Sequence, residues 1–320
     1  MSGLPVVLAV DLGGTAMKGA VVGEDGVTVA ESTLATPADG ILTALVALLH
    51  DLRRTAADDG HDVVGAGVAT PGMLDEERGL VHYASNLGWR DVPLLDILRS
   101  ELSLPVAVGH DVRAAGLAER SSGAARGFGD FALVPIGTGV AAALVSSGGA
   151  VTGATGAAGE FGHIPVTLDG PTCLCGSHGC LEAYTSNIAT LKRYLGRDLS
   201  PAQTRDLLRT SGLTIGDVVA RCLAGEARAC ATLDETAHFL GIGLATIINA
   251  LNPAQIIVGG EITAAWDRIA PIIREEIAKR ALTLAAGATP IVPEPAGASP
   301  RLRGATALVT APVFAAPQVA

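Results

Sequence analysis

Short apolar runs that end in glycine-rich turns dominate the first part of the chain. Residues 6–10 are apolar throughout, which predicts a buried strand. Asp11-Leu12-Gly13-Gly14-Thr15 then predicts a turn, and residues 18–22 predict a returning strand. Further on, the pattern predicts helices over residues 41–54 and 113–120 and strands over residues 63–68 and 105–108. Strands that alternate with helices in this way indicate an α/β layered domain.

The pattern of an apolar strand, a glycine turn and a second apolar strand is repeated from about residue 131. Residues 131–136 predict a strand, Gly137-Thr138-Gly139 a turn, and residues 140–145 a second strand. The part that follows is mostly helical, with helices predicted over residues 186–195, 202–210, 234–251 and 264–281. A strand over residues 255–258 meets Gly259-Gly260. We hypothesise that the two strand–turn–strand units are related, and that two facing halves bring both glycine turns to one cleft.

Composition and charge exclude several classes of protein. The chain has 320 residues, of which 49% are hydrophobic, so it can bury a large core and is not disordered. A net charge of −10, from 22 basic and 32 acidic side chains, argues against nucleic acid as a partner. Residues 131–159 carry no charge, but Pro135 and many glycines favour buried strands, so we expect no membrane insertion.

The cysteines and the N-terminal segment predict a cytoplasmic location. No basic segment followed by an apolar stretch precedes Asp11, so no secretory signal is expected. The chain has five cysteines, an odd number, and three of them are crowded together, which is unlike a secreted disulfide framework. Cys222 and Cys230 fall on a predicted helix and are expected to be plain thiols.

The first glycine turn has the residues of a phosphate site. Without Cβ atoms, Gly13 and Gly14 let the backbone approach a phosphate, with amide groups and the Thr15 hydroxyl as donors. Asp11 is suited to Mg²⁺, which prefers a few carboxylates together with waters and phosphates, and Lys18 supplies a point charge. An ordinary hairpin turn with an Asx cap fits the same residues equally well. Walker A and dinucleotide motifs are absent from the sequence.

Asp111 stands where a predicted strand ends and a helix begins. The carboxyl ends of strands are where α/β proteins present reactive groups, so Asp111 is a candidate general base for a substrate hydroxyl. Aspartate before a helix is also a common N-cap, and the residue by itself favours that role.

The spacing His163-x9-Cys173-x-Cys175-x4-Cys180 is the strongest local signal. One imidazole and three thiolates complete a tetrahedral Zn²⁺ shell with no open position, which predicts a structural site; free thiols around a flexible loop are the alternative. A metal-pinned loop would fix the neighbouring carboxylates Glu160 and Glu182, and rigid acceptors suit a polyhydroxylated ligand. Asn86 adds a neutral donor and acceptor.

Together these residues resemble the ROK family of bacterial sugar kinases and repressors, within the actin/hexokinase-like ATPase fold. Asp11-Leu12-Gly13-Gly14-Thr15 and Gly137-Thr138-Gly139 resemble its two phosphate turns, and Gly259-Gly260 its adenosine-side pair. Its two signature segments are matched by Gly159-Glu160-Phe161-Gly162-His163 and by Cys173-Leu174-Cys175-Gly176-Ser177-His178-Gly179-Cys180-Leu181-Glu182. The last segment is long and specific, and the resemblance covers nearly the whole chain.

The resemblance implies an α/β fold of two facing actin-like ATPase (ribonuclease H-like) lobes with a cleft between them. A small lobe is expected over residues 1–115, with residues 298–320 packing back on it, and a larger lobe with the zinc-binding loop over residues 116–297. By analogy with the family, we also expect a homodimer or homotetramer.

The resemblance further implies ATP-dependent phosphorylation of the 6-hydroxyl of a hexose, with glucose as the default substrate. Asp111 is then the catalytic base, and Asn86, Glu160, His163 and Glu182 contact the sugar. His163 would bind Zn²⁺ through one ring nitrogen and leave the other for the ligand. The two glycine turns, with Mg²⁺ and Lys18, would hold the phosphates of ATP.

The chain departs from the family pattern in three places. His110 stands before Asp111 where the family usually has a sugar-binding Asn, which leaves the exact sugar open. Arg113 replaces a second Asn and would weaken Asp111 as a base if the two paired. Val140-Ala141-Ala142-Ala143 follows the second turn where glycine is common, and these methyl groups could restrict the approach of a phosphate.

Three alternative functions remain open. A kinase for an amino or acetamido hexose, such as N-acetylglucosamine, N-acetylmannosamine or kanosamine, fits the same motifs. A non-catalytic sugar-sensing protein is suggested by His110, Arg113 and the alanines, although Asp11, Lys18 and Asp111 are retained. A sugar-responsive repressor is less favoured, because only ten residues precede Asp11 and the chain is acidic.

Overall fold

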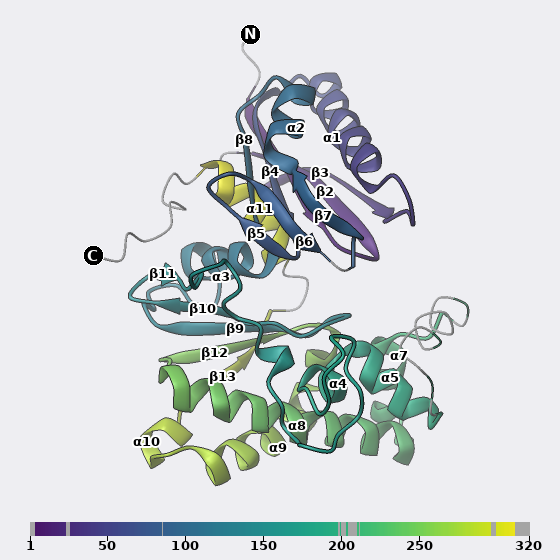
Figure 1. The fold of residues 1–320 in the computed structure, drawn as a ribbon, viewed down its shortest axis with the longest axis vertical. Helices are drawn as coiled ribbons and strands as arrows, with labels where there is room; N and C mark the ends of the chain where they lie inside the picture. The colour runs from purple at the N-terminus through teal and green to yellow at the C-terminus, as the bar shows by residue number, and fades with distance from the viewer. Residues whose placement is uncertain are drawn as a thin grey trace. The chain divides into compact units, whose positions relative to one another are not determined.

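The chain folds into two compact units, each built on its own sheet (Figure 1). The computed structural model describes residues 4–23, 26–84, 86–197, 199, 203, 210, 212–295 and 299–310. The first unit holds the described residues up to Arg126, then Gly149–Ala158, and those from Ser299 on; the second holds Gly127–Gly148 and Gly159–Ala298. The expected α/β class is confirmed.

The unit boundary differs from the expected residue 115. It follows Arg126, because α3 (Asp111–Ser122) packs against α11 (Pro300–Thr310) inside the first unit. The segment Gly149–Ala158 also joins the first unit, where the Gly156 carbonyl accepts a hydrogen bond from Arg113. In the late segment, α11 packs on the sheet of the first unit; residues 311–320 lie outside the described residues.

A mixed five-stranded sheet forms the centre of the first unit. Its order is β3-β2-β1-β4-β8, formed by β1 (Pro5–Leu12), β2 (Ala16–Gly23), β3 (Thr28–Ala35), β4 (Asp62–Thr70) and β8 (Val106–His110). β2 is antiparallel to both β1 and β3, whereas β4 runs parallel to β1 and β8. The carboxyl ends of β1, β4 and β8 therefore lie at one edge, and Asp11 and Asp111 are both at that edge.

Alternate side chains of β1 point to two different packing layers. Val6, Leu8 and Val10 join the core formed with α1 (Ile41–Asp58) and α2 (Leu94–Leu102). Val7 and Ala9 face the other way and pack with Leu302 and Ala305 of α11. This period of two explains why the strand is apolar at every position, since both faces of the sheet are covered.

Glycines on the second face let α11 approach the sheet closely. A Cβ atom on Gly67 of β4 would lie 1.8 Å from the carbonyl oxygen of Ala305. Val309 occupies the corresponding space over Gly65, and Leu308 occupies that over Gly109 of β8. Side chains at these glycine positions would push the helix away, so the glycines fix where α11 docks.

A small antiparallel sheet completes the first unit. It has the order β5-β6-β7, from β5 (Met73–Asp75), β6 (Leu80–Ala84) and β7 (Trp89–Pro93). The sequence pattern did not predict these short strands. The first unit also contains the two-residue strand β11 (Gly149–Ala150).

The second unit repeats the plan of the first sheet. Its strands β10 (Ala143–Ser146), β9 (Phe131–Pro135), β12 (Gln255–Gly259) and β13 (Ile291–Pro293) are neighbours in that order. β10 is antiparallel to β9, and β12 is parallel to β9 and β13, just as β2 and β4 flank β1. The repeated topology supports the hypothesis that the two units are related; their superposition stays a prediction.

Helices make up most of the rest of the second unit. They are α4 (Glu182–Thr185), α5 (Asn187–Leu195), α7 (Ile215–Leu223), α8 (Ala227–Leu251), α9 (Trp266–Arg280) and α10 (Leu284–Gly287), with short 3₁₀ turns at Phe161–His163 and Glu261–Ala265. The long helices α8 and α9 lie side by side next to the sheet (Figure 1). Most of the helix predicted over residues 202–210 lies outside the described residues.

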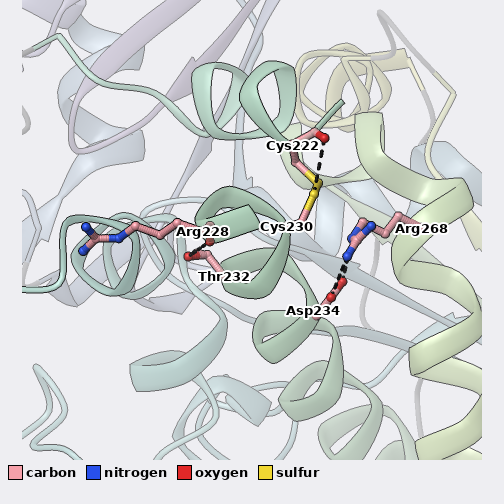
Figure 2. The surroundings of a disulfide bond; sticks show 6 residues. All are labelled: Cys222, Arg228, Cys230, Thr232, Asp234 and Arg268. Atoms are coloured by element: carbon pink, nitrogen blue, oxygen red, sulfur yellow. Dashed lines mark hydrogen bonds and ion pairs between the residues drawn. A yellow bond between two sulfur atoms is a disulfide. The ribbon is translucent and has the colours of Figure 1, made fainter. Parts of the chain in front are cut away.

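Cys222 and Cys230 correct the expectation of two plain thiols. They form a disulfide between the end of α7 and the first turn of α8, with their Cα atoms 4.7 Å apart (Figure 2). The chain reverses between the two helices at residues 224–226, which brings the cysteines together. The sequence pattern did not predict this disulfide, because it placed both cysteines on one helix.

No helix among the described residues combines the length and the apolar character needed to cross a membrane. The uncharged stretch over residues 131–159 instead forms β9, β10 and β11 with their connecting turns, as the sequence predicted.

Candidate functional site

The first glycine turn joins β1 to β2 and is held by backbone bonds. Gly13 N–H donates to the Ala16 carbonyl at 2.9 Å, and Thr36 Oγ1 donates to the Gly13 carbonyl at 2.6 Å. A Cβ atom on Gly14 would lie 3.0 Å from the Cβ of Asn86. The fold thus places Asn86 directly against the turn, and the exposed Gly14 and Thr15 leave backbone and hydroxyl groups open to a ligand.

Asp11 is a carboxylate with an unused buried oxygen. Its Oδ1 is buried and has no hydrogen-bond partner, and Asp11 pairs in register with Lys18 across the hairpin. Burial raises the pKa of Asp11 from 3.8 to about 6; the Arg301 guanidinium lowers it, Asp111 raises it, and Lys18 lowers it. A buried carboxylate that is costly to ionise and lacks a donor at Oδ1 is suited to a cation.

Asp111 begins α3 with both side-chain oxygens in defined surroundings. Oδ1 accepts a hydrogen bond from Val112 N–H at 2.8 Å and lies 3.4 Å from His110 Nδ1. Oδ2 lies 3.7 Å from a terminal nitrogen of Arg301, beyond the range of a hydrogen bond. The side chain is 8% exposed, so the fold holds a nearly buried carboxylate at the start of α3.

The helix N-cap is His110 rather than Asp111. His110 Nδ1 accepts a 3.5 Å hydrogen bond from Arg113 N–H, the geometry of an N-cap. Burial is the main cause that lowers the pKa of His110, so its ring is neutral near pH 7. Nδ1 therefore faces the first turn of α3.

Arg113 does not pair with Asp111, which removes the expected weakening of the base. Its guanidinium instead pairs with Glu76 at 3.0–3.1 Å and donates to the Gly156 carbonyl at 2.8 Å. Glu76 also accepts a hydrogen bond from His110 N–H at 3.0 Å. The Arg113 side chain is 3% exposed and that of Glu76 is 31% exposed, so this partly buried pair links the strand–helix junction to the turn after β5.

The second glycine turn and the glycine pair lie side by side in the second unit. Gly137 N–H donates to the Gly139 carbonyl, and Ile136 N–H donates to the Gly259 carbonyl, both at 2.9 Å. Gly260 has φ = 111°, and a Cβ atom there would lie 2.0 Å from the Ile136 carbonyl oxygen. Only glycine permits both this backbone conformation and this approach.

Three of the four residues after the second turn are buried, whereas Ala141 is half-buried, and the expected restriction on the approach of a phosphate stays a prediction. Val140, Ala142 and Ala143 are at most 3% exposed, so their methyl groups pack in the core of the unit. The backbone of Val140 is also in close contact with Gly162, where a Cβ atom would lie 2.0 Å from the Val140 carbonyl oxygen.

The predicted zinc ligands come together. Ligand atoms of His163, Cys173, Cys175 and Cys180 all lie within 4.8 Å of one another. Cys173 Sγ is 3.7 Å from His163 Nδ1, and Cys175 Sγ is 3.7 Å from Cys180 Sγ. Burial raises the pKa of the Cys173 thiol to about 12, so a thiolate there requires a nearby cation.

The two acidic residues of the zinc-loop region have different surroundings. Glu160 Oε2 lies 3.7 Å from His163 Nε2, the nitrogen that points away from the cysteines. Glu182 Oε2 instead accepts a hydrogen bond from Val140 N–H at 2.9 Å, and its other oxygen lies 3.9 Å from Cys173 Sγ. Glu182 therefore links the cysteine cluster to the second glycine turn.

Each unit assembles its own share of the predicted residues. In the first, the turn at Asp11–Thr15 lies against Asn86, and Asp11 is electrostatically coupled to both Asp111 and Lys18. In the second, the glycine turn, Gly259-Gly260, Glu182 and the cysteine cluster are contiguous, and Glu160 joins them through His163. Sequence reasoning missed Glu76 and Arg301, which nothing in the local pattern marks.

Comparisons with known proteins point to one family. The sequence profile of the ROK family matches residues 7–311. The chain is 35% identical over 283 residues to a glucokinase of Halalkalibacterium halodurans, covering 86% of each chain. It is 25% identical over 265 residues to the xylose repressor of Bacillus subtilis, covering 83% of this chain and 66% of the repressor.

Solved structures agree with the sequence comparison. A ROK family glucokinase from Streptomyces griseus, in complex with glucose and AMPPNP, has a TM-score of 0.81 to this chain at 30% identity. The match covers 95% of this chain and 99% of that one. Profile, relatives and structures converge, and the chain belongs to the ROK family.

Proposed function

We propose that this protein is an ATP-dependent kinase that phosphorylates the 6-hydroxyl of a hexose, with glucose as the leading substrate. The observation that carries the proposal is Asp111, a buried carboxylate at the carboxyl end of β8 with one oxygen bonded to backbone and the other open. Similarity to glucokinases over more than four-fifths of the chain supports the substrate class.

The chemistry follows from the two oxygens of Asp111. Val112 N–H holds Oδ1, so Oδ2 faces the sugar hydroxyl and takes its proton. The hydroxyl oxygen forms a bond to the terminal phosphorus of ATP as the bond between that phosphorus and the ADP oxygen breaks. Because phosphoryl transfer depends mainly on positioning and charge, a base that is held in place contributes directly to the rate.

Asp11 is the residue that would hold Mg²⁺. Its buried Oδ1 has no donor, which suits a cation, and it lies at the start of the glycine turn that would bind phosphate. When bound with ATP, Mg²⁺ supplies charge neutralisation for the phosphate oxygens. Lys18, opposite Asp11 in the hairpin, adds a further positive charge.

The cysteine cluster fits a structural Zn²⁺ ion held by His163, Cys173, Cys175 and Cys180. Zinc–sulfur bonds of about 2.3 Å give a tetrahedron with edges of about 3.8 Å. The 3.7 Å separation of Cys175 and Cys180 matches such an edge. Such an ion would fix Glu160 and Glu182, and His163 Nε2 beside Glu160 would be free of the metal and available to the sugar.

The identity of the sugar depends on His110. A neutral imidazole stands where the family usually has an amide, so contacts to one sugar position differ from those of the usual pattern. Glucose remains the leading substrate because glucokinases are among the relatives, at 35% and 30% identity. An amino or acetamido hexose is the second candidate, favoured only by this substitution.

An ADP-release assay across hexoses and their amino and acetamido derivatives tests the function, with Asp111→Asn as the control. We expect turnover on glucose and a loss of about 10²–10⁴ in kcat in Asp111→Asn with glucose binding preserved. Binding of sugar without ADP release by the wild type would instead support a sugar-sensing protein. Light scattering of the same samples tests the expected homodimer or homotetramer. Fractionation of the producing cells tests the expected cytoplasmic location.

A further inference from the structure

Helix α11 is locked against α3 by close backbone contact. A Cβ atom on Gly304 would lie 2.5 Å from the carbonyl carbon of Ala114. The buried carboxylate of Glu119, which is fully shielded from solvent, forms an ion pair with Arg303. Arg303 also donates to Ser122 Oγ at 3.2 Å. The N-terminal half of α11 therefore has a defined position against α3.

This docking brings Arg301 to Asp111. Arg301 is the second residue of α11, and its guanidinium lies 3.7 Å from Asp111 Oδ2. The side chain of Arg301 is 34% exposed, whereas that of Asp111 is 8% exposed. The cation thus reaches from a partly open position to a nearly buried carboxylate, where its charge is less screened than on the surface.

The same guanidinium also acts on Asp11. Burial raises the pKa of Asp11 to about 6, and Arg301 is the strongest influence that lowers it. Arg113, the other arginine near the junction, is engaged by Glu76 and by the Gly156 carbonyl. Arg301 therefore lies beside Asp111 and also acts electrostatically on Asp11.

We propose that Arg301 is a positioning residue for the catalytic base. Val112 N–H fixes Oδ1 of Asp111, and Arg301 draws Oδ2 toward the open side, so the two contacts together define the plane of the carboxylate. At 3.7 Å the guanidinium attracts Oδ2 without occupying its lone pairs in a hydrogen bond, so Oδ2 still accepts the proton. This proposal rests on the proposed function and assigns a residue that no local motif marks.

The test compares Arg301→Gln and Arg301→Lys with the wild type in steady-state kinetics. Arg301→Gln should lower kcat by about 10- to 100-fold with little change in KM for glucose or ATP, since the base, rather than binding, is misaligned. Arg301→Lys keeps the positive charge but loses the planar guanidinium, and its kcat should be closer to that of the wild type than to that of Arg301→Gln.

Arg54→Gln is the matched control. Arg54 forms an exposed ion pair with Asp51 on α1, which packs on the other face of the sheet, away from Asp111. This variant should leave kcat unchanged. The melting temperature of each variant is measured in parallel; a structural role for Arg301 would lower it and leave kcat of the folded protein intact.

Three outcomes would overturn the proposal: wild-type kcat in Arg301→Gln, a loss confined to KM for ATP, or a kcat loss that Arg301→Lys shares in full. A failure of the proposed function can be distinguished from a failure of the role of Arg301. If the wild type phosphorylates no sugar, both ideas are wrong, whereas an active wild type with an inactive Asp111→Asn and a normal Arg301→Gln refutes only the role of Arg301.

Discussion

The ionised Asp11 carboxylate should lower the stability of the folded protein. Its pKa is raised from 3.8 to about 6, chiefly by burial, so its ionised form is less favourable in the folded state than in the unfolded chain. At about 1.4 kcal/mol per pKa unit, ionisation costs the folded state about 3 kcal/mol. Asn has nearly the same shape as a protonated aspartic acid, so Asp11→Asn should remove this cost.

The sign of the pH dependence follows from proton binding. Between pH 3.8 and about 6 the folded state holds a proton on Asp11 that the unfolded state has lost, so this group makes stability fall as pH rises. Asp11→Asn has no carboxyl group at this position, so its stability does not fall with pH for this reason. The variant should therefore match the wild type near pH 4 and exceed it by about 2–3 kcal/mol at pH 7.5.

Urea unfolding in Mg²⁺-free buffer provides the assay. The chain has two tryptophans, of which Trp89 lies in the first unit and Trp266 in the second. In a Trp266→Phe background, the fluorescence of Trp89 reports the unit that contains Asp11. EDTA is avoided because it would also remove zinc from the cysteine cluster.

Asp51→Asn is the control, since Asp51 is an exposed residue of α1. It should change stability little at either pH. The reasoning would be refuted if Asp11→Asn were no more stable than the wild type at pH 7.5. A gain of equal size at pH 4.5 would refute it as well, because a pH-independent gain cannot come from ionisation. The stabilised variant should also have lost turnover with Mg·ATP.

Further predictions concern close contacts and the metal. Gly67→Ala should lower the stability of the first unit by about 2–4 kcal/mol in urea unfolding, because the new methyl group would collide with the Ala305 carbonyl and push α11 away from the sheet. Gly139→Ala should raise KM for ATP several-fold in kinetics, since its Cβ would lie 2.6 Å from Glu182 Oε2; an unchanged KM would contradict this role. Metal analysis should find one zinc per chain in the wild type and none in Cys173→Ser, with a higher KM for glucose.

The parts of the fold that depend on local pattern could be predicted from the sequence. The helix predicted over residues 186–195 is α5 (Asn187–Leu195), with Ser186 as its N-cap. The predicted cysteine cluster also forms, because its four ligands lie within one loop region and its adjoining helix. Local spacing determines these features, and so the sequence reveals them.

Features that depend on distant contacts could not be predicted. Glu76 reaches Arg113 from a turn after β5, and Arg301 reaches Asp111 from a helix near the other end of the sequence. The expected meeting of Arg113 with Asp111 rested on sequence proximity, but the N–H of Arg113 is capped by His110 and its guanidinium turns to Glu76. Side-chain direction at the first turn of a helix decides such pairings, and spacing alone does not reveal it.

The docking of α11 has a consequence for synthesis on the ribosome. The sheet face formed by Val7, Ala9 and Ala20 is completed only when Leu302 and Ala305 arrive. The whole second unit is translated between β8 and α11, so a nascent chain carries this apolar face uncovered while most of its length is made. A stalled or nicked chain that lacks α11 would keep an open face lined with glycines, a surface that chaperones and proteases recognise.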